Sequence, residues 1–147
     1  QNVNYFRILR LANVYGDDHK NGFFKKFFFT INKKKNIIFS NLLTSRNMIH
    51  IKDVIKSIVL IIKNKKLEKL DKLIINIGNE NIKLSKIKKI FFSYFDRRLN
   101  LENKKIPLRK DSSQVISTEK FDNLFKWRKI KINKTLLTIL KKNEKYI

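Results

Sequence analysis

The stretch FRILRLANVYG, residues 6–16, decides the fold of this chain. Residues 6–14 are mostly apolar and stop at Tyr15-Gly16, which predicts a short buried β-strand. A polar residue, Asn13, stands at the end of this run. One interpretation is turn chemistry, in which an Asn at a strand end hydrogen-bonds its own backbone. The other is a contact with a ligand.

Outward from this strand, the pattern of apolar residues alternates between strand and helix. KLIINI at residues 72–77 predicts a second buried strand, and the helical period of residues 53–63 and 84–92 predicts two helices. Asp53 is expected to cap the first of these helices. Further helices are expected at residues 23–32, 118–125 and 134–142, and short extended segments at residues 36–40, 48–51 and 104–108. Alternating strands and helices predict an α/β fold.

Composition agrees with a folded domain. The chain has 147 residues, of which 42% are hydrophobic and 32% charged, enough for one domain with one core. It has no Cys, which suits a reducing compartment, and no apolar run of about 18 residues that could span a bilayer. No signal peptide is visible, so we expect a cytoplasmic protein. The first residue, Gln1, suggests that the reading frame begins upstream.

The net charge of +23 has two interpretations. It could indicate a polyanion partner such as nucleic acid. Alternatively, the abundance of Lys, Asn, Ile and Phe is typical of an AT-rich coding sequence, which places Lys on every solvated face. The lysines are spread along the chain and far outnumber the arginines, although Arg is the better reader of bases. We therefore favour codon bias and expect no specific nucleic-acid partner and no membrane partner.

Four motifs follow one another along the chain: R-x-x-N-x-Y-G at residues 10–16, RNMIHIKDV at 46–54, INIG at 75–78, and Arg-Lys-Asp at 109–111 ahead of STEKFDNLFKW at 117–127. In order and spacing they resemble the C-terminal half of the extended short-chain dehydrogenase/reductases, the NAD-dependent sugar-nucleotide epimerase/dehydratase family. The resemblance implies an α/β fold made of the last Rossmann strands and a small mixed α/β substrate-binding domain. Residues 1–16 would be a late Rossmann strand with the active-site turn. Residues 17–147 would be the substrate-binding domain, with residues 72–77 returning to the Rossmann sheet.

The chain departs from the family pattern at several positions. Asp17 replaces a usual Pro, Ser40 a common Gly, Asn47 the Asp after Arg46, and Lys126 the Gly before Trp127; the loop before Asp111 is short. The largest departure is an absence, since the three glycines form no phosphate-binding loop and no catalytic Tyr-x-x-x-Lys precedes residue 10. The spacing of Tyr94 and Arg98 imitates that pair, but too late in the chain. We therefore assign no catalytic residue and expect a fragment that is inactive alone.

The resemblance supplies candidate binding residues. Asn13 would point into the crevice at the strand's end, where its amide can donate to a phosphate or sugar hydroxyl, and Ala12 would lie on the nicotinamide side. Arg46 would grip the diphosphate of the substrate, because a guanidinium forms a bidentate fork with phosphate oxygens. Arg109 would reach the same diphosphate, and Asp111 would accept from a ribose hydroxyl. Phe39 would lie against the nucleotide base, although an ordinary core Phe fits equally well.

Three other residues are interpreted as structural. His50 is expected to satisfy buried backbone groups ahead of a helix, as Asp53 would by capping it. The two lie three positions apart without a third ligand, which makes a poor metal site, so none is expected. Gly78 is expected to permit a turn after the strand.

Two functions remain open at this stage. The first is a fragment of an NAD- or NADP-dependent sugar-nucleotide epimerase, dehydratase or reductase, hence an isomerase or oxidoreductase. Its substrate would be a nucleotide-diphosphate sugar, and the complete enzyme would form a homodimer. The second is a free-standing basic α/β module that binds RNA or another polyanion non-specifically. The order of the motifs favours the first, and leaves the sugar, the base and the reaction subtype open.

Overall fold

The chain folds around strands that leave one small sheet and enter another. The structure is a computed structural model that describes residues 6–16, 24, 37–38, 42–68, 72–95, 101–102 and 113–143. Its strands are β1 (Phe6–Leu11), β2 (Asn13–Tyr15), β3 (Ile37–Ile38), β4 (Ser45–His50), β5 (Lys72–Ile77), β6 (Glu80–Lys83) and β7 (Leu101–Glu102). Its named helices are α2 (Ile51–Lys63), α3 (Lys65–Glu68), α4 (Leu84–Phe95), α5 (Glu119–Leu124) and α6 (Ile132–Asn143).

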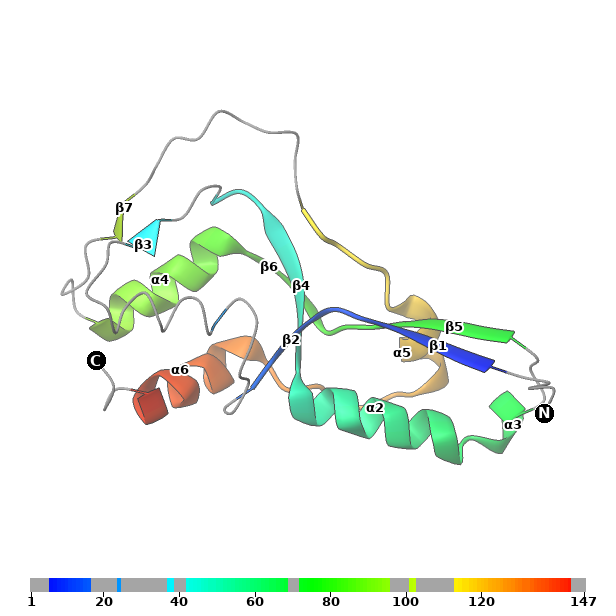
Figure 1. Cartoon of the computed structure of the whole chain (residues 1–147). Coiled ribbons are helices and arrows are strands. Elements are labelled where there is room, and N and C mark those ends of the chain that lie inside the picture. The colour runs from blue at the N-terminus through cyan, green and yellow to red at the C-terminus, as the bar shows by residue number, and fades with distance from the viewer. Residues whose placement is uncertain are drawn as a thin grey trace.

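Five of the strands form two sheets, one of two strands and one of three. β1 and β5 pair in parallel, with Ile8 opposite Ile74. β2 pairs in parallel with β4, and β4 pairs antiparallel with β6. β1 continues into β2 through Ala12, and β5 continues into β6 through Gly78 and Asn79, so the chain passes between the two sheets twice (Figure 1). A third pair, β3 with β7, is parallel.

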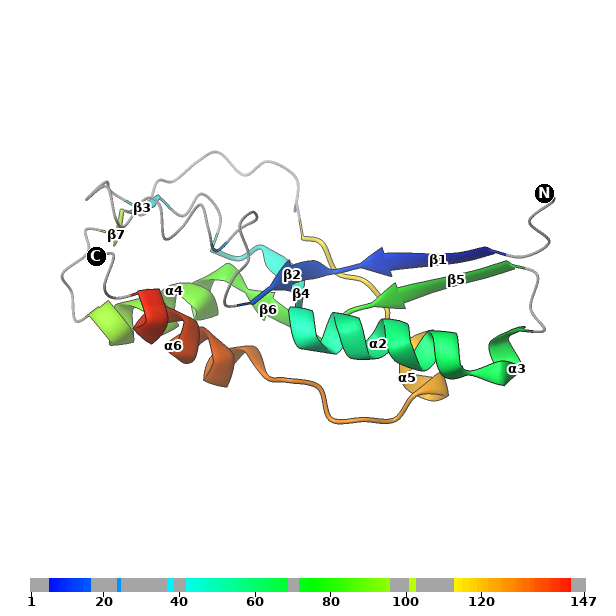
Figure 2. The ribbon, with the colours of Figure 1, turned by 60° about the horizontal axis from the view of Figure 1, so that its bottom comes forward.

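The helices divide between the two sheets. Seen in Figure 2, α2 and α5 lie on the same face of the β1–β5 sheet, while α4 and α6 lie side by side at the other end of the molecule. Two clusters of buried side chains follow this division. One joins β4 and β6 to α4 and α6 around Met48, Ile82 and Phe91, and the other joins β5 to α2 and α5 around Ile75 and Phe121.

Most sequence predictions of secondary structure are confirmed. The α/β class is confirmed, as are the strand at residues 72–77 and the helices that became α2, α4, α5 and α6. The extended segments expected at 36–40 and 48–51 correspond to β3 and β4. The strand expected over residues 6–14 is wrong in one respect, because it is interrupted at Ala12 where its pairing changes from β5 to β4. The sequence patterns predict no element at α3, β6 or β7, all of which the structure contains.

Two predicted segments lie wholly or largely outside the residues that the structure describes. Of the helix expected at residues 23–32 only Phe24 is described, in helical conformation, and its buried ring packs edge-on against Tyr15 with the ring centroids 5.8 Å apart. The segment expected at 104–108 lies outside the described residues.

His50 and Asp53 lie at the start of α2, and only one of them has the structural role expected from the sequence. His50 is the N-cap, and its Nδ1 accepts a hydrogen bond from the backbone N–H of Lys52 at 3.2 Å, so its structural role is confirmed. The capping role expected of Asp53 is wrong. Its buried carboxylate instead accepts from the backbone N–H of Ile130 at 2.8 Å, because that distant segment passes beside the start of the helix.

The apolar stripe of α2 is only partly used for packing. Val54 and Ile61 are buried against the β5 cluster. Five other apolar side chains of the helix are exposed: Ile51, Ile55, Ile58, Val59 and Ile62. Their spacing follows one helical face, so the described structure leaves an apolar face of α2 uncovered.

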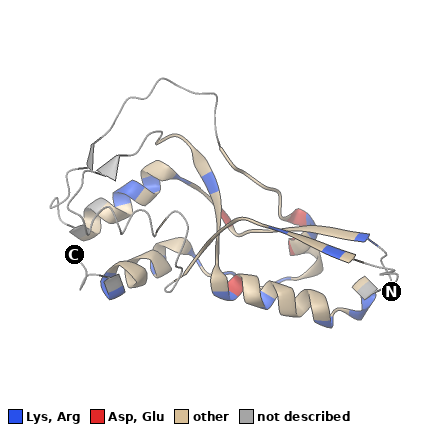
Figure 3. Ribbon diagram, viewed as in Figure 1, with Lys and Arg blue, Asp and Glu red and all other residues tan. Residues whose placement is uncertain are grey.

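Charged side chains are distributed over many elements. Figure 3 shows Lys and Arg on α2, α4 and α6 as well as on the strands, and few acidic residues. This spread agrees with codon bias as the origin of the net charge of +23. Among the described residues, no helix combines the length and apolar character needed to cross a membrane.

Candidate functional site

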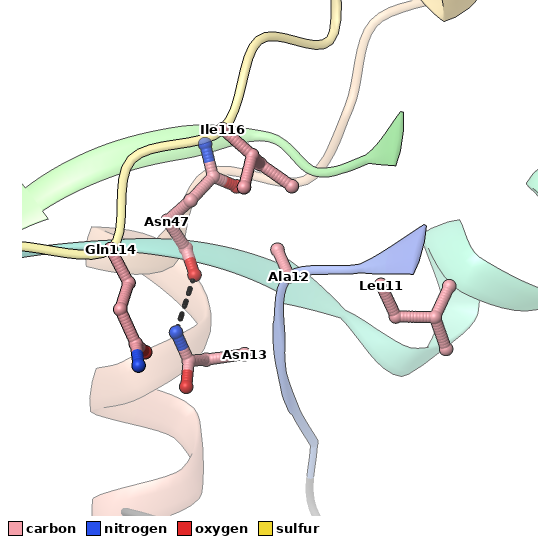
Figure 4. A pocket seen from close by; sticks show the side chains of 6 residues that line it. All are labelled: Leu11, Ala12, Asn13, Asn47, Gln114 and Ile116. Atoms are coloured by element: carbon pink, nitrogen blue, oxygen red, sulfur yellow. Dashed lines mark hydrogen bonds between the residues drawn. The ribbon is translucent and has the colours of Figure 1, made fainter. Parts of the chain in front are cut away.

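A hollow lies where β1 leaves the parallel sheet and becomes β2. Its volume is about 350 Å³, and its lining residues are Leu11, Ala12, Asn13, Asn47, Gln114 and Ile116 (Figure 4). Three of them are consecutive residues at the crossing itself. Open α/β sheets bind ligands at the carboxyl ends of strands where neighbouring strands diverge. The hollow occupies that kind of position.

Backbone hydrogen bonds fix both sides of the hollow. The N–H of Ala12 still donates to the carbonyl of Ile77 at 2.9 Å, whereas the next residue, Asn13, already pairs with β4. Opposite, Gln114 lies alongside β4: its N–H donates to the carbonyl of Ser45 at 3.0 Å, and its carbonyl accepts from the N–H of Asn47 at 2.9 Å. The segment that contains Gln114, distant in sequence from β1 and β2, therefore forms one wall of the hollow.

Amide side chains supply the polar part of the lining. The Nδ2 group of Asn13 donates to the carbonyl of Asn47 at 3.0 Å, which orients the Asn13 amide. The side chain of Asn47 is held in turn, since its Nδ2 donates to Oδ1 of Asn81 at 2.8 Å and its Oδ1 accepts from the N–H of Asn79 at 3.2 Å. In Figure 4 the amides of Asn13 and Gln114 lie on the same side of the hollow. Such groups can both donate to and accept from a polar ligand.

Gly78 lets β5 approach this network closely. A Cβ at this position would collide with Oδ1 of Asn47 and would lie 3.1 Å from Cγ2 of Thr118. The expectation that Gly78 serves mainly to permit a turn is therefore replaced by another reason, which is the space that the Asn47 amide occupies.

The comparison with protein families agrees with this geometry. The model of the NAD dependent epimerase/dehydratase family matches residues 2–78, just over half of the chain. This chain belongs to that family. A search among curated proteins found no match.

Solved structures show the same fold in epimerases and dehydratases. UDP-glucuronic acid 4-epimerase from Bacillus cereus has a TM-score of 0.76 at 19% identity, over 95% of this chain and 45% of that one. UDP-glucose 4-epimerase from Thermotoga maritima has a TM-score of 0.70 at 19% identity, over 96% and 47%. dTDP-glucose 4,6-dehydratase from Bacillus anthracis has a TM-score of 0.72 at 18% identity, over 95% and 45%. The chain thus spans about half the length of these relatives.

The structure brings only some of the predicted site residues of this epimerase/dehydratase family member together. Ala12 and Asn13 line the hollow. Arg46 does not: it precedes Asn47 on β4, so its side chain leaves the strand on the opposite face, where its Nη1 donates to the carbonyl of Ser45 at 3.3 Å. Phe39, Arg109 and Asp111 lie outside the described residues.

Four lining residues are not among the predicted site residues: Leu11, Asn47, Gln114 and Ile116. Of the two polar ones, the sequence marks Asn47 only as a departure from the family's usual Asp, and that substitution is the available signal. Gln114 carried no signal, because it lies in a segment without periodicity whose position depends on its pairing with β4.

The described site has no group suited to acid–base chemistry. Its polar lining consists of amides, and no cluster of three metal-ligating side chains occurs in the described part of the chain. The nearby Tyr15 is buried, which raises the pKa of its phenol above the ordinary value of 10.0, and its ring stacks edge-on against His50 with centroids 5.2 Å apart. A phenol with a raised pKa is a poor base at neutral pH. The described amides of the lining can bind a polar ligand through both donor and acceptor atoms.

Proposed function

We propose that this chain is the nucleotide-sugar-binding half of an NAD- or NADP-dependent sugar-nucleotide epimerase or dehydratase. The observation that carries the proposal is the hollow at the crossing of β1 into β2, with the oriented amide of Asn13 in its wall. Residues 1–16 would be the late Rossmann strand and active-site turn, and residues 17–147 the substrate-binding domain with β5 returning to the Rossmann sheet.

The ligands of the structural relatives support this choice of substrate class. The Bacillus cereus epimerase was solved with UDP-glucuronic acid and NAD, and the Thermotoga maritima enzyme with UDP-glucose. The Bacillus anthracis dehydratase was solved with NAD. By analogy, a nucleotide-diphosphate sugar is the proposed substrate here, and the complete enzyme is proposed to act as a homodimer.

Each candidate residue has a role in this proposal. Asn13 donates its Nδ2 to the carbonyl of Asn47, so Oδ1 is the end of the amide left to accept from a substrate hydroxyl, and no described residue donates to it. Arg46 would hold the diphosphate from the face of β4 opposite to that of Asn47. Arg109 would reach the same diphosphate, Asp111 would bind a ribose hydroxyl, and Phe39 would lie against the base.

The nicotinamide cofactor would lie on the side of the hollow formed by Ala12. Ala12 and the half-exposed Leu11 supply apolar lining there, which supports this placement of a flat aromatic ring. These residues would contribute only part of the cofactor site, because the three glycines of the chain form no phosphate-binding loop. When bound, NAD(P) would supply hydride transfer. Turnover is therefore proposed only for a complete enzyme, and the isolated chain is expected to show none.

A titration with UDP tests the binding function directly. We expect UDP to shift the amide NMR signals of Ala12, Asn13, Asn47 and Gln114 in the 147-residue chain. A chain with a charge of +23 also attracts anions non-specifically, so inorganic pyrophosphate serves as the control ligand, at low and at high salt. Shifts at these four residues that persist in high salt and exceed those with pyrophosphate support the proposal. Equal shifts with both ligands, spread over the Lys-rich helices, would support the polyanion-binding alternative.

Arg46 requires its own test, because the hollow does not include it. If it contacts the diphosphate, Arg46→Ala should weaken UDP binding by about 2–4 kcal/mol, and Arg46→Lys by less, because Lys keeps the charge and loses the fork. Lys65→Ala, an equal charge change on the exposed start of α3, is the control and should have almost no effect. Equal small effects of the two Ala variants would remove Arg46 from the site.

A further inference from the structure

Lys129 differs from the solvated lysines that give the chain most of its charge. Its side chain is only 9% exposed. Its Nζ donates to Oδ1 of Asp122 at 2.6 Å and to the carbonyl of Gly78 at 2.7 Å, and it lies 5.3 Å from the ring centroid of Phe121. An ammonium group has three N–H donors, and it is stable away from water only where oxygens or an aromatic face receive them. These three contacts therefore hold the ammonium in one place.

One of these contacts fixes the peptide group between Gly78 and Asn79. The carbonyl of this group accepts from Lys129, and its N–H is shared between Oδ1 of Asn47 and the carbonyl of Met48, both at 3.2 Å. Because a trans peptide group is planar, with its C=O and N–H pointing in opposite directions, a bond that fixes the carbonyl also aims the N–H. A cation on the carbonyl also polarises the group and strengthens the bond that its N–H donates. Lys129 thereby holds the side chain of Asn47, which lines the hollow.

The amide of Asn13 depends on the same support. Its Nδ2 donates to the backbone carbonyl of Asn47 at 3.0 Å, so the orientation of the Asn13 amide follows the position of Asn47 (Figure 4). These two residues form one wall of the hollow, and the Gly78–Asn79 peptide group supports this wall from behind.

The second contact of Lys129 supports the other wall, which Gln114 and Ile116 form. Oδ2 of Asp122 accepts from the hydroxyl of Thr118 at 2.6 Å, while Oδ1 of the same carboxylate is bound to Lys129. Thr118 follows Ile116 by two positions, so Asp122 holds the end of this wall. The ammonium of Lys129 is therefore in contact with the supports of both walls.

We propose that Lys129 is a positioning residue of the candidate site, where its ammonium joins the supports of the two walls and sets the orientation of the Asn13 and Asn47 amides. Lys129 does not line the hollow, so it acts through these residues. Polar groups that are held in place before a ligand arrives lose less entropy when they bind it. The side chain of Asp122 is 46% exposed, and ion pairs with exposed carboxylates contribute little to stability, so the main effect of the contact is geometric. The proposal rests on the proposed function, because it takes the hollow for the nucleotide-sugar site.

Two substitutions that change the net charge in opposite directions test this role. Lys129→Met removes the ammonium and keeps a side chain of similar length, and Asp122→Asn removes its ion-pair partner. We expect both variants of the 147-residue chain to bind UDP more weakly, Lys129→Met at least tenfold and Asp122→Asn at least threefold. If net charge alone attracted UDP, Asp122→Asn would bind it more tightly, because this variant is more positive than the parent chain. Tighter UDP binding by Asp122→Asn would therefore overturn the proposal.

Lys126→Met is the matched control for Lys129→Met. Lys126 is an exposed lysine of the same segment, so its replacement makes the same change in charge without removing a contact to either wall. Its UDP affinity should stay within twofold of that of the parent chain. Equal losses of affinity in Lys126→Met and Lys129→Met would count against the proposal.

Hydrogen exchange separates positioning from a general gain in stability. In Lys129→Met the amide of Asn79 should exchange at least tenfold faster, because its peptide group is no longer fixed. The amide of Ile75, buried in β5, should exchange as in the parent chain. The side-chain NMR signals of Asn13 and Asn47 should shift in the same variant. Equal acceleration at Asn79 and Ile75, with unchanged side-chain signals, would show that Lys129 only stabilises the fold and would refute the proposal.

The role of Lys129 and the nucleotide-sugar site can fail separately. If the parent chain binds UDP no better than pyrophosphate, the nucleotide-sugar site is refuted, and the exchange and NMR measurements still decide whether Lys129 positions the walls. If UDP binding is specific and Lys129→Met leaves it unchanged, the role of Lys129 is refuted and the site stands.

Discussion

The carboxylate of Asp53 accepts a hydrogen bond from the backbone N–H of Ile130 at 2.8 Å, across 77 positions of sequence. Close by, Asn79 donates its Nδ2 to the carbonyl of Ile130 at 2.6 Å, and Lys129 donates its Nζ to the carbonyl of Gly78 at 2.7 Å. The segment that leads into α6 is thus tied both to α2 and to the crossing of β5 into β6. The backbone N–H of Asn79 also donates to Oδ1 of Asn47, which lines the hollow, so this segment is connected to the candidate site through Asn79.

Replacing Asp53 should destabilise the chain. Asp53→Ala leaves the partly buried N–H of Ile130 without its charged acceptor, and hydrogen bonds to charged groups contribute about 1.5–3 kcal/mol. We expect a loss of that size in the free energy of unfolding, measured by urea denaturation, and a smaller loss for Asp53→Asn, which keeps an acceptor oxygen. Glu119→Ala on exposed α5 is the charge-matched control, expected to change stability by no more than about 0.5 kcal/mol. A similar change in both Ala variants would show that the Asp53 contact contributes little.

Gly78→Ala should be destabilising because of the Asn47 side chain. The new methyl group would overlap Oδ1 of Asn47, and overpacking of this kind costs about 1–3 kcal/mol. Asn47→Ala removes the obstructing amide, so Gly78→Ala should be milder in that background. The measurement is a double-mutant cycle in urea denaturation. Additive effects would contradict the explanation from close approach.

Gly16→Ala is a useful comparison for the same argument. A Cβ at Gly16 would lie 2.6 Å from Cγ2 of Ile51, the branch methyl on its Cβ, which a β-branched side chain in a helix moves only by changing its stiff χ1 angle. Gly16→Ala should therefore also be destabilising, but its cost should be the same in the Asn47→Ala background, whereas that of Gly78→Ala should fall.

Tyr15 should make stability depend on pH in the alkaline range. Burial raises the pKa of its phenol above 10.0, so the folded state favours the neutral form more than the unfolded state does. That contribution is fully present below pH 10 and is lost as the pH rises toward the raised value. Phe cannot ionise, so the free energy of unfolding of Tyr15→Phe should rise relative to that of the parent chain between pH 9 and pH 11. A constant difference over that range would show that Tyr15 titrates normally.

Local patterns were sufficient to predict much of the fold. The strand β5 and the helices α2, α4 and α6 were found because their apolar periods are complete within the segment itself. The interruption at Ala12 could not be predicted, because the apolar run continues through it. The break exists only because β1 pairs with β5 whereas β2 pairs with β4, and such pairings involve residues far apart in sequence.

In the candidate site, too, local patterns predict some residues, whereas others are placed only by contacts between distant parts of the chain. Asn13 was found because it is part of a motif beside a strand end. Gln114 enters the site only through its backbone pairing with Ser45 and Asn47 on β4, which no local pattern reveals. The position of Asp53 in the sequence predicts a capping role, but its carboxylate accepts from the N–H of Ile130, a partner that only the tertiary structure brings close.

Gln114→Glu offers a sharp test of whether the hollow receives a diphosphate. The side chain of Gln114 is exposed and lines the hollow, so the substitution adds a negative charge there while the backbone pairing with β4 is kept. Two unit charges about 6 Å apart interact by roughly 1–3 kcal/mol between the dielectric constants of water and of a protein surface. UDP affinity, measured by calorimetry at low salt, should therefore fall by about tenfold, with a smaller loss in high salt. The free energy of unfolding should change by less than about 0.5 kcal/mol.

Ser93→Asp places the same charge at an exposed position of α4 and should leave UDP affinity almost unchanged. If Gln114→Glu and Ser93→Asp weaken UDP binding equally, the ligand responds to the net charge of the chain, and the diphosphate does not lie in the hollow.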